Sequence, residues 1–248
     1  MGTIYILWLR QVKKYFRSRS RMIGSLGQPL LFLVVFGFGF GSTFAKAGGG
    51  NYIQFLAPGI ILMSVLFTAI FSGIELIWDR QFGFLKETMV APVSRLTIML
   101  GRTLGGATVA TIQGLIVFGL TLIVGFRPDN LYMLPVALLL VFMVAILFTT
   151  LGTAIASMLE DMQGFQLIMN FLVMPIFFLS GALFPLSGAP AALQAVVKFD
   201  PLTYGVDAVR SAMIGQSNFG MATDFSVLLI VTVALVATAS YLFGKIQA

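Results

Sequence analysis

The amino-acid sequence predicts an all-α integral membrane protein with six transmembrane helices and an amphipathic N-terminal helix. Hydrophobic residues make up 58% of the 248 residues and charged residues only 10%, whereas soluble domains carry roughly 25% charged residues. Water could not solvate a surface of this composition. The length fits one transmembrane domain over 1–248, with an interfacial helix in 1–21 and a six-span bundle in 22–248.

Residues 1–21 predict an amphipathic helix that lies along the cytoplasmic membrane surface rather than crossing it. At the helical period, one face is apolar, with Ile4, Tyr5, Trp8, Leu9, Val12, Tyr15 and Phe16. The opposite face is basic, with Arg10, Lys13, Lys14, Arg17 and Arg21. Two roles are open for this helix: an anchor attracted to anionic lipid, and a lever that a cytoplasmic partner also touches.

Six apolar segments are each long enough to span a bilayer. A helix needs roughly 20 apolar residues to cross a hydrocarbon core about 30 Å thick. We expect the spans at 22–44, 53–78, 96–126, 131–159, 164–184 and 225–244. Some are longer than one crossing requires, which predicts tilt or extension beyond the headgroups.

The distribution of lysine and arginine predicts the orientation of the chain. Eleven of the fifteen fall on one side of a six-span topology: Arg10, Lys13, Lys14, Arg17, Arg19, Arg21, Arg80, Lys86, Arg95, Arg102 and Lys245. The other four are Lys46, Arg127, Lys198 and Arg210. Because basic residues concentrate on the cytoplasmic side of membrane proteins, we expect both termini in the cytoplasm.

Neither cysteine nor histidine occurs in the chain. This excludes a zinc site built from these ligands, a Ser-His-Asp triad and a histidine proton relay. No G-x-x-x-x-G-K-[ST] loop occurs, so the chain has no recognisable Walker-type phosphate cradle. We therefore expect a non-catalytic protein with no cofactor or metal of its own. The net charge of +6 comes from basic residues between apolar runs, where they set orientation, so we expect no nucleic-acid partner.

The predicted spans carry almost no ionisable side chains. Glu75 is the clearest exception, within a turn of Asp79 and Arg80 near the cytoplasmic end. Either it is an interfacial carboxylate paired with a nearby base, or it belongs to an ion site. Proton- or sodium-coupled carriers usually place carboxylates or broken helices near the bilayer midplane. Their scarcity here favours an external source of energy.

The connection between the second and third spans, 78–95, is polar at its start and then amphipathic. Its short helix should end before Pro92, because the residue before a proline is disfavoured in the α conformation. Taken alone, this pattern also fits an ordinary interfacial loop helix. Its notable residues are Asp79-Arg80, Gly83, Leu85, Lys86-Glu87, Pro92-Val93-Ser94-Arg95 and Gly101-Arg102.

A second informative stretch surrounds the fifth span. It contains Leu179-Ser180-Gly181-Ala182-Leu183-Phe184-Pro185, then Asp200-Pro201-Leu202-Thr203-Tyr204 and Asp207-Ala208-Val209-Arg210. Together with the 78–95 connection, the amphipathic helix and the six spans, this stretch resembles the membrane subunits, or permeases, of type-2 ATP-binding cassette (ABC) transporters. The resemblance covers nearly the whole chain and is closest to the drug-resistance exporter branch. Asp79 stands where many relatives have Glu, which keeps the position acidic.

The resemblance implies a function and two functional regions. It implies an exporter permease in the cytoplasmic membrane of a prokaryote, working as a dimer, most simply of two identical copies, in contact with membrane lipid. A separate ABC-type ATPase would bind ATP and Mg²⁺. The 78–95 connection would be the coupling helix that docks on this ATPase, through Asp79, Arg80, Gly83, Phe84, Leu85, Lys86, Glu87 and Pro92. Short re-entrant outer helices would form an outer gate with Pro185, Pro201, Tyr204, Asp207 and Arg210.

Several details of these regions follow as expectations. Phe84 and Leu85 would fill an apolar groove of the ATPase, because buried apolar anchors dominate such interfaces. Asp207 and Arg210, three residues apart, would form an ion pair on one helix face. From the residues alone, the outer segment also fits an inert interfacial loop. A secondary carrier or channel is the alternative function, and a membrane-embedded enzyme or assembly factor is a third.

Overall fold

The computed structural model describes residues 2–46, 50–90, 92–188 and 190–246. These residues form helices and connections and contain no strand, as the sequence predicts. The helices are α1 (Gly2–Arg17), α2 (Arg19–Gly39), α3 (Gly41–Lys46), α4 (Tyr52–Phe71), α5 (Ile74–Gln81), α6 (Phe84–Val90), α7 (Arg95–Val124), η1 (Leu131–Met133), α8 (Leu134–Met158), α9 (Met162–Leu179), η2 (Leu186–Gly188), α10 (Ala191–Val197), α11 (Pro201–Ile214) and α12 (Met221–Gly244).

Within the described residues, six helical segments are long and apolar enough to cross a membrane, which confirms the predicted number of spans. They are Arg19–Gly39, Tyr52–Gln81, Arg95–Val124, Leu131–Met158, Met162–Leu179 and Met221–Gly244. The predicted ends differ by a few residues. The fifth helix, for example, ends at Leu179 rather than near Phe184, because Gly181 has a φ of +70° that turns the chain.

Side chains at the helix starts explain several boundaries. Asn51, Ser94, Asp161 and Asp200 each accept a hydrogen bond from a backbone N–H in the first turn of α4, α7, α9 and α11, respectively. These contacts satisfy donors that a helix start otherwise leaves unpaired. Left-handed glycines, Gly125 and Gly215, end α7 and α11. Local sequence therefore sets where these membrane helices begin and end.

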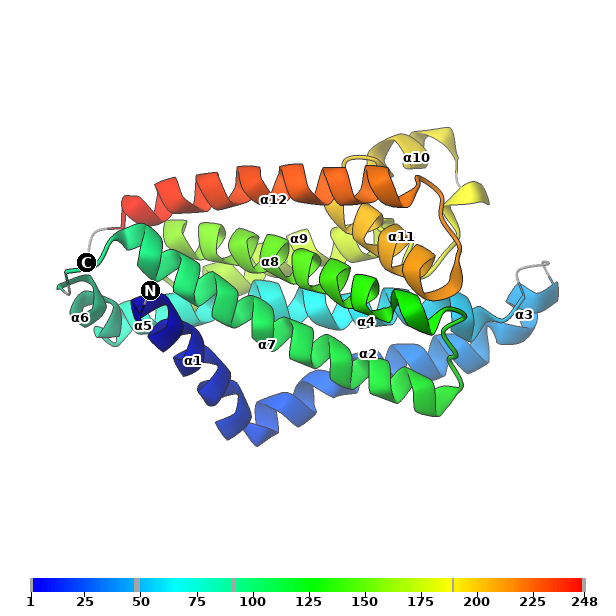
Figure 1. Cartoon of the computed structure of the whole chain (residues 1–248), viewed down its shortest axis with the longest axis horizontal. Helices are drawn as coiled ribbons and strands as arrows, with labels where there is room; N and C mark the ends of the chain where they lie inside the picture. The colour runs from blue at the N-terminus through cyan, green and yellow to red at the C-terminus, as the bar shows by residue number, and fades with distance from the viewer. Residues whose placement is uncertain (1, 47–49, 91, 189, 247–248) are drawn as a thin grey trace.

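The bundle has two distinct ends (Figure 1). The start of α1, the end of α12, α5 and α6 lie at one end, here called the proximal end. α3, α10 and α11 lie at the opposite, distal end. Finding the beginning and end of the chain together agrees with an even number of crossings.

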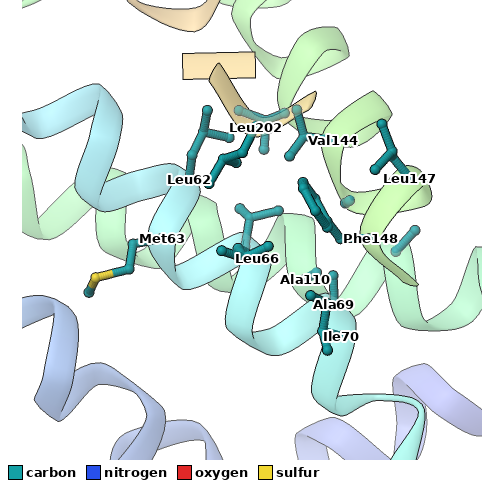
Figure 2. Close-up of a cluster of buried hydrophobic side chains, with 14 of the residues drawn as sticks. Leu62, Met63, Leu66, Ala69, Ile70, Ala110, Val144, Leu147, Phe148 and Leu202 are labelled. Atoms are coloured by element: carbon teal, nitrogen blue, oxygen red, sulfur yellow. The ribbon is translucent and has the colours of Figure 1, made fainter. Parts of the chain in front are cut away.

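Helix α4 forms the centre of the bundle. It packs against α2, α7, α8, α9 and α11, and its side chains are buried along most of its length. Figure 2 shows the middle of this core, where Leu62 and Leu66 of α4 lie beside Val144 and Phe148 of α8 and Leu202 of α11. By contrast, α2, α9 and α12 leave many large apolar side chains exposed. That exposure suits a surface in contact with lipid or with another membrane subunit.

The amphipathic helix α1 lies obliquely across the flank of α7 (Figure 1). Glycines of α7 permit this close contact: a Cβ at Gly105 would lie only 2.7 Å from the Cβ of Gln11. Two hydrogen bonds join the helices, from Trp8 Nε1 to Thr108 Oγ1 at 2.9 Å and from the Tyr15 hydroxyl to Gln113 Oε1 at 2.5 Å. The helix is therefore bound to the membrane domain as well as amphipathic.

The expected short outer helices are present at the distal end. α10 has 7 residues and α11 has 14, so neither is long enough to span the bilayer. α11 is almost wholly buried and packs against α4, α8 and α12. Its burial does not fit the alternative of an inert interfacial loop.

Candidate functional site

A buried ion cluster at the proximal end joins three helices. Asp79 of α5 accepts two hydrogen bonds from Arg10 of α1, at 2.9 and 3.0 Å, and a third from Arg102 of α7. Asp79 and Arg102 are both buried. Arg102 also donates to the backbone carbonyl of Glu75 at 3.4 Å. The sequence placed Asp79 among the residues that face the ATPase, but here its carboxylate points into the membrane domain.

Glu75 forms a second cluster one helical turn away. Its carboxylate pairs with Lys14 of α1 at 3.3 Å and with Arg21 of α2 at 2.8 Å. This contact supports the interpretation of Glu75 as an interfacial carboxylate paired with a base. The bases come from the two N-terminal helices rather than from its sequence neighbours. Together the two clusters fix α1 and α2 to α5.

Arg80 and Arg95 make contacts at the edge of this region. Arg80 pairs with Glu160 at 3.0 Å, linking the connection before α6 to the one between α8 and α9. Arg95 donates to the carbonyl oxygens of Gly244 and Ile246, at 2.5 and 3.0 Å. The first turn of α7 is thereby tied to the end of α12. These exposed contacts hold the connections of the proximal end together.

Helix α6 is the short amphipathic helix that the sequence predicts between the second and third spans. Gly83 begins it with a φ of +80°, which allows a tight turn after α5. Leu85 is buried, and Phe84 is half-buried with its ring 3.7 Å from the guanidinium carbon of Arg10. Lys86 and Glu87 are exposed, as is Pro92 beyond the helix end.

The exposed face of α6 differs from the one expected. The sequence reasoning placed Leu85 in a groove of the ATPase, but its complete burial places it inside this chain. The exposed apolar side chains of the region are Phe82 and Val90, which are 82% and 86% exposed. Sequence reasoning missed both as candidates for partner contact. Two large apolar side chains within a polar connection were the available signal.

Arg10 connects α6 to the rest of the proximal end. Its guanidinium lies over Phe84 of α6 while both of its terminal nitrogens donate to Asp79 of α5. Arg102 binds the same carboxylate from α7. A displacement of α6 would therefore act on Arg10 of α1 and, through Asp79, on α5 and α7.

A cavity of about 320 Å³ opens beside these clusters, between α1, α2, α4 and α7. Its wall includes polar side chains, among them Gln11, Gln28 and Thr68, and apolar ones such as Phe67. Glu75 and Arg21 lie at its edge as an ion pair. This volume is at the lower end of the range for small-molecule sites, roughly 300 to 1,000 Å³. The sequence did not indicate the cavity, because its lining comes from five separate helices, α5 included through Glu75.

At the distal end, four of the five residues predicted for the outer gate belong to α11. Pro201 occupies its first turn, and Tyr204, Asp207 and Arg210 are buried along it. The Tyr204 hydroxyl donates to the carbonyl of Lys198 at 2.9 Å. Pro185 lies apart from them, exposed in the connection after α9. The structure thus brings together four of the predicted gate residues and leaves the fifth at the rim.

The expected ion pair between Asp207 and Arg210 does not form. The Arg210 guanidinium donates to the carbonyls of Gly181 and Phe55, at 2.9 and 3.4 Å, and lies 3.9 Å from the Phe55 ring centre. Burial lowers the pKa of Arg210 to about 10, and the nearby charge of Asp207 opposes this shift. Asp207 instead accepts hydrogen bonds from the 217–219 connection. The prediction was wrong because both groups find partners outside their own helix.

These features define a multi-pass helical membrane protein with a charged end tied to an amphipathic helix and a buried polar helix at the other end. Comparison with known proteins identifies the class further. Residues 3–214 match the sequence model of the ABC-2 type transporter family, and the chain belongs to this family.

Relatives along most of the chain are named as transport proteins or nodulation proteins. Nodulation protein J of Rhizobium leguminosarum bv. trifolii is 30% identical over 216 residues, covering 86% of this chain and 79% of that protein. The inner membrane transport permease YadH of Escherichia coli K12 is 25% identical over 233 residues, covering 92% and 89%. The putative transport permease ycf38 of Cyanophora paradoxa is 29% identical over 214 residues, covering 84% and 72%. The family resemblance inferred from the sequence is confirmed, and the chain is the membrane subunit of a transporter.

Proposed function

We propose that this chain is the permease subunit of an ABC exporter, forming the translocation pathway as a dimer and coupling to a separate cytoplasmic ATPase. The chain is an ABC-2 family member, and one observation at its proximal end carries the proposal. α6 exposes one face and packs by the other on Arg10 of α1, which binds the Asp79 cluster that joins α1, α5 and α7. ATP and Mg²⁺ would bind to the ATPase, since the chain has no Walker-type loop.

The relative strengths of the contacts suggest how force passes from α6 into the membrane. Removing one partner of a buried ion pair costs about 3–5 kcal/mol, because the other charge is left uncompensated. An exposed pair such as Arg80 with Glu160 contributes about 0–1 kcal/mol. The cluster around Asp79 therefore moves as one unit, while the exposed pair breaks and re-forms. α1, α5 and α7 would follow α6 together.

The proposed orientation places the proximal end in the cytoplasm. α1, the α5–α6 region and the start of α7 carry most of the basic residues of the chain and lie in the proximal half of the bundle (Figure 1). The positive-inside rule then puts both termini on the cytoplasmic side, where a soluble ATPase could reach α6. A cytoplasmic membrane of a prokaryote fits the bacterial inner-membrane relative.

A second copy of the chain and membrane lipid are the other proposed partners. The outward faces of α2 and α9 expose large apolar side chains, such as Leu31 and Phe38 on α2 and Leu167 and Phe171 on α9. In a dimer, part of this surface would bury against the second copy and the rest would face lipid tails. Twelve spans would then enclose the pathway.

A secondary carrier or channel is the competing function, and one observation speaks for it. Asp224 is a buried carboxyl within a candidate span, the kind of group that proton-coupled carriers use. It lies in the first turn of α12, however, at the end of the span rather than near its middle. The ABC-2 family membership favours transport driven by ATP.

The test is to purify the tagged chain together with the ATPase that copurifies with it and to reconstitute the complex in vesicles. Transport that needs ATP and persists when a protonophore removes the proton gradient supports the proposal. Transport driven by an imposed proton gradient without ATP would instead establish a secondary carrier. Sequencing the proteins that copurify identifies the ATPase.

A further inference from the structure

A buried carboxyl at the distal end has no hydrogen-bond donor. Asp224, in the first turn of α12, is 0% exposed, and neither of its oxygens has a hydrogen-bond partner among the described donors. Leaving an ionised carboxylate buried without a partner is costly, and such groups usually take up a proton instead. Asp224 is the only charged residue in the sequence of α12, so no base on its own helix can neutralise it.

The neighbouring carboxyl of Asp207 is in the opposite situation. It accepts hydrogen bonds from the Ser217 hydroxyl, from the backbone N–H and side-chain amide of Asn218, and from the backbone N–H of Phe219, at 2.7 to 3.0 Å. All of these groups are donors, which is the environment of an ionised carboxylate. Asp207 therefore holds the negative charge and shapes the 215–220 connection that leads into α12.

α11 packs against α12, and the Asp207 carboxyl binds the backbone N–H of Phe219, two residues before α12 begins, so the two carboxyl groups belong to the same junction. Two carboxylates cannot hydrogen-bond to one another unless one of them carries a proton, because an ionised carboxylate is only an acceptor. Since the oxygens of Asp207 are occupied by donors, the proton belongs on Asp224. Asp224 then becomes the donor and Asp207 the acceptor.

The charged groups around Asp207 and Asp224 balance if the two carboxyl groups hold one proton between them. On α11, Arg210 is buried near Asp207, and the Tyr204 hydroxyl donates to the carbonyl of Lys198. α8, which also packs on α12, has no charged residue, and the charged residues of α7 lie in its first part, toward the proximal end. One guanidinium, one carboxylate and one protonated carboxyl make a neutral buried group. A second negative charge would leave it unbalanced.

We infer that Asp207 and Asp224 form a proton-binding site at the distal end, and that the bound proton holds the start of α12 against α11. Loss of the proton would place two anions side by side in a buried space, so the first turn of α12 would move away from α11. If the distal end faces outward, as the proposed function requires, protons of the outer medium would favour the closed arrangement of the outer helices.

The proton itself can be observed by infrared spectroscopy of the purified chain. Asp200 complicates the spectrum, because burial raises its pKa to about 7, so Asp200→Asn is the reference protein. At about pH 7, this reference should show the C=O stretching band of a protonated carboxyl, shifted by exchange into D₂O. Adding Asp224→Asn should remove the band. A reference protein with no such band would overturn the inference without any further variant, as would a band that survives in the correctly folded double variant.

The movement can be measured because the chain contains no cysteine to remove. Spin labels at Tyr132→Cys and Thr223→Cys, both at exposed positions, report the distance between the starts of α8 and α12. The distance should increase from neutral to alkaline buffer. In Asp224→Asn protein it should stay short, because the amide can donate permanently to Asp207. A distance that does not change with pH overturns the proposed movement. Neither experiment uses ATP or substrate, so both can fail or succeed independently of the exporter proposal.

Discussion

Asp79 is the residue on which the proximal end depends most. It receives a bidentate contact from Arg10 and a further hydrogen bond from Arg102, so one carboxylate serves three helices. Arg102 has one terminal nitrogen with no partner even in this arrangement. Loss of the carboxylate would leave Arg102 buried without an ion-pair partner among the described residues. We therefore expect Asp79 to stabilise the fold as well as to link α6 to the membrane helices.

We predict that Asp79→Ala lowers the free energy of unfolding by about 3–5 kcal/mol, the usual cost of breaking a buried ion pair. Arg80→Ala is the matched control: it removes the exposed contact with Glu160 and should cost about 0–1 kcal/mol. Thermal unfolding of both variants in the same detergent provides the comparison. Equal, small effects of the two substitutions would mean that the Asp79 cluster is not a fixed unit.

Asp200 gives the distal end a measurable pH dependence. Burial raises its pKa from 3.8 to about 7, opposed by hydrogen bonds from Leu202 and Thr203. The folded chain therefore binds this proton more tightly than the unfolded chain. The corresponding stabilisation is complete below about pH 4 and is lost as the pH rises to about 7.

Asp200→Asn should remove this dependence while keeping an oxygen that caps α11. Between about pH 5 and about pH 8, the melting temperature of the variant should rise relative to that of the unsubstituted chain. Melting curves at a series of pH values check the sign. A constant difference between the two proteins across this range would show that Asp200 has an ordinary pKa.

At the scale of the elements, α6 has an inward and an outward side with different expected roles. Leu85→Ala removes a fully buried side chain and should destabilise the chain by about 2–5 kcal/mol. The double substitution Phe82→Ala and Val90→Ala changes exposed positions and should leave unfolding nearly unchanged. It should weaken association with the ATPase by about 1–3 kcal/mol if these side chains are the anchors.

Copurification with the ATPase and melting temperature, measured on the same preparations, separate these effects. Lys86 is also exposed, and Lys86→Ala is the control for a charged side chain at the edge of the contact. It should weaken association with the ATPase less than the double substitution does. If Phe82→Ala with Val90→Ala left association and transport intact, the exposed face of α6 would not be the docking surface.

The elements themselves could be predicted from the sequence, whereas their contacts could not. The hydropathy that identifies a membrane span is summed over about 20 residues, so one polar residue within the span does not hide it. The partners of Asp79 and Glu75 come from positions 23 to 69 residues away, and no local pattern indicates them. The pair predicted from helix spacing, Asp207 with Arg210, was wrong because tertiary partners outcompeted the neighbour.

The same distinction between local pattern and tertiary contact holds for α6, which was predicted as a helix but with the wrong side chain facing the ATPase. Its existence and its end before Pro92 follow from local conformational preference. Which side faces inward depends on where α1 and Arg10 lie, and this is a property of the whole bundle. Leu85 and Phe82 look equally suitable as anchors in the sequence. Only the fold separates the buried one from the exposed one.

At the scale of the whole molecule, the proposed orientation makes a direct prediction. Val90 lies at the proximal end and Tyr132 in the connection before α8, and both are strongly exposed. In a chain with no native cysteine, a single Tyr132→Cys should react with a membrane-impermeant maleimide in intact cells. Val90→Cys should react only after the membrane is permeabilised. The reverse pattern would place both termini outside the cytoplasm.

The central claim is that an external ATPase drives this membrane subunit through its proximal end. The most direct measurement compares ATP hydrolysis and transport by the purified chain alone, by its complex with the ATPase, and by a complex carrying Asp79→Asn, all in the same lipid vesicles. We expect no hydrolysis by the chain alone and sustained hydrolysis by the complex. In the Asp79→Asn complex, transport should fall more than hydrolysis, because α6 would no longer move α1 and α7 as one unit. Hydrolysis by the contaminant-free chain alone, or transport by the complex that proceeds without ATP, would contradict the account.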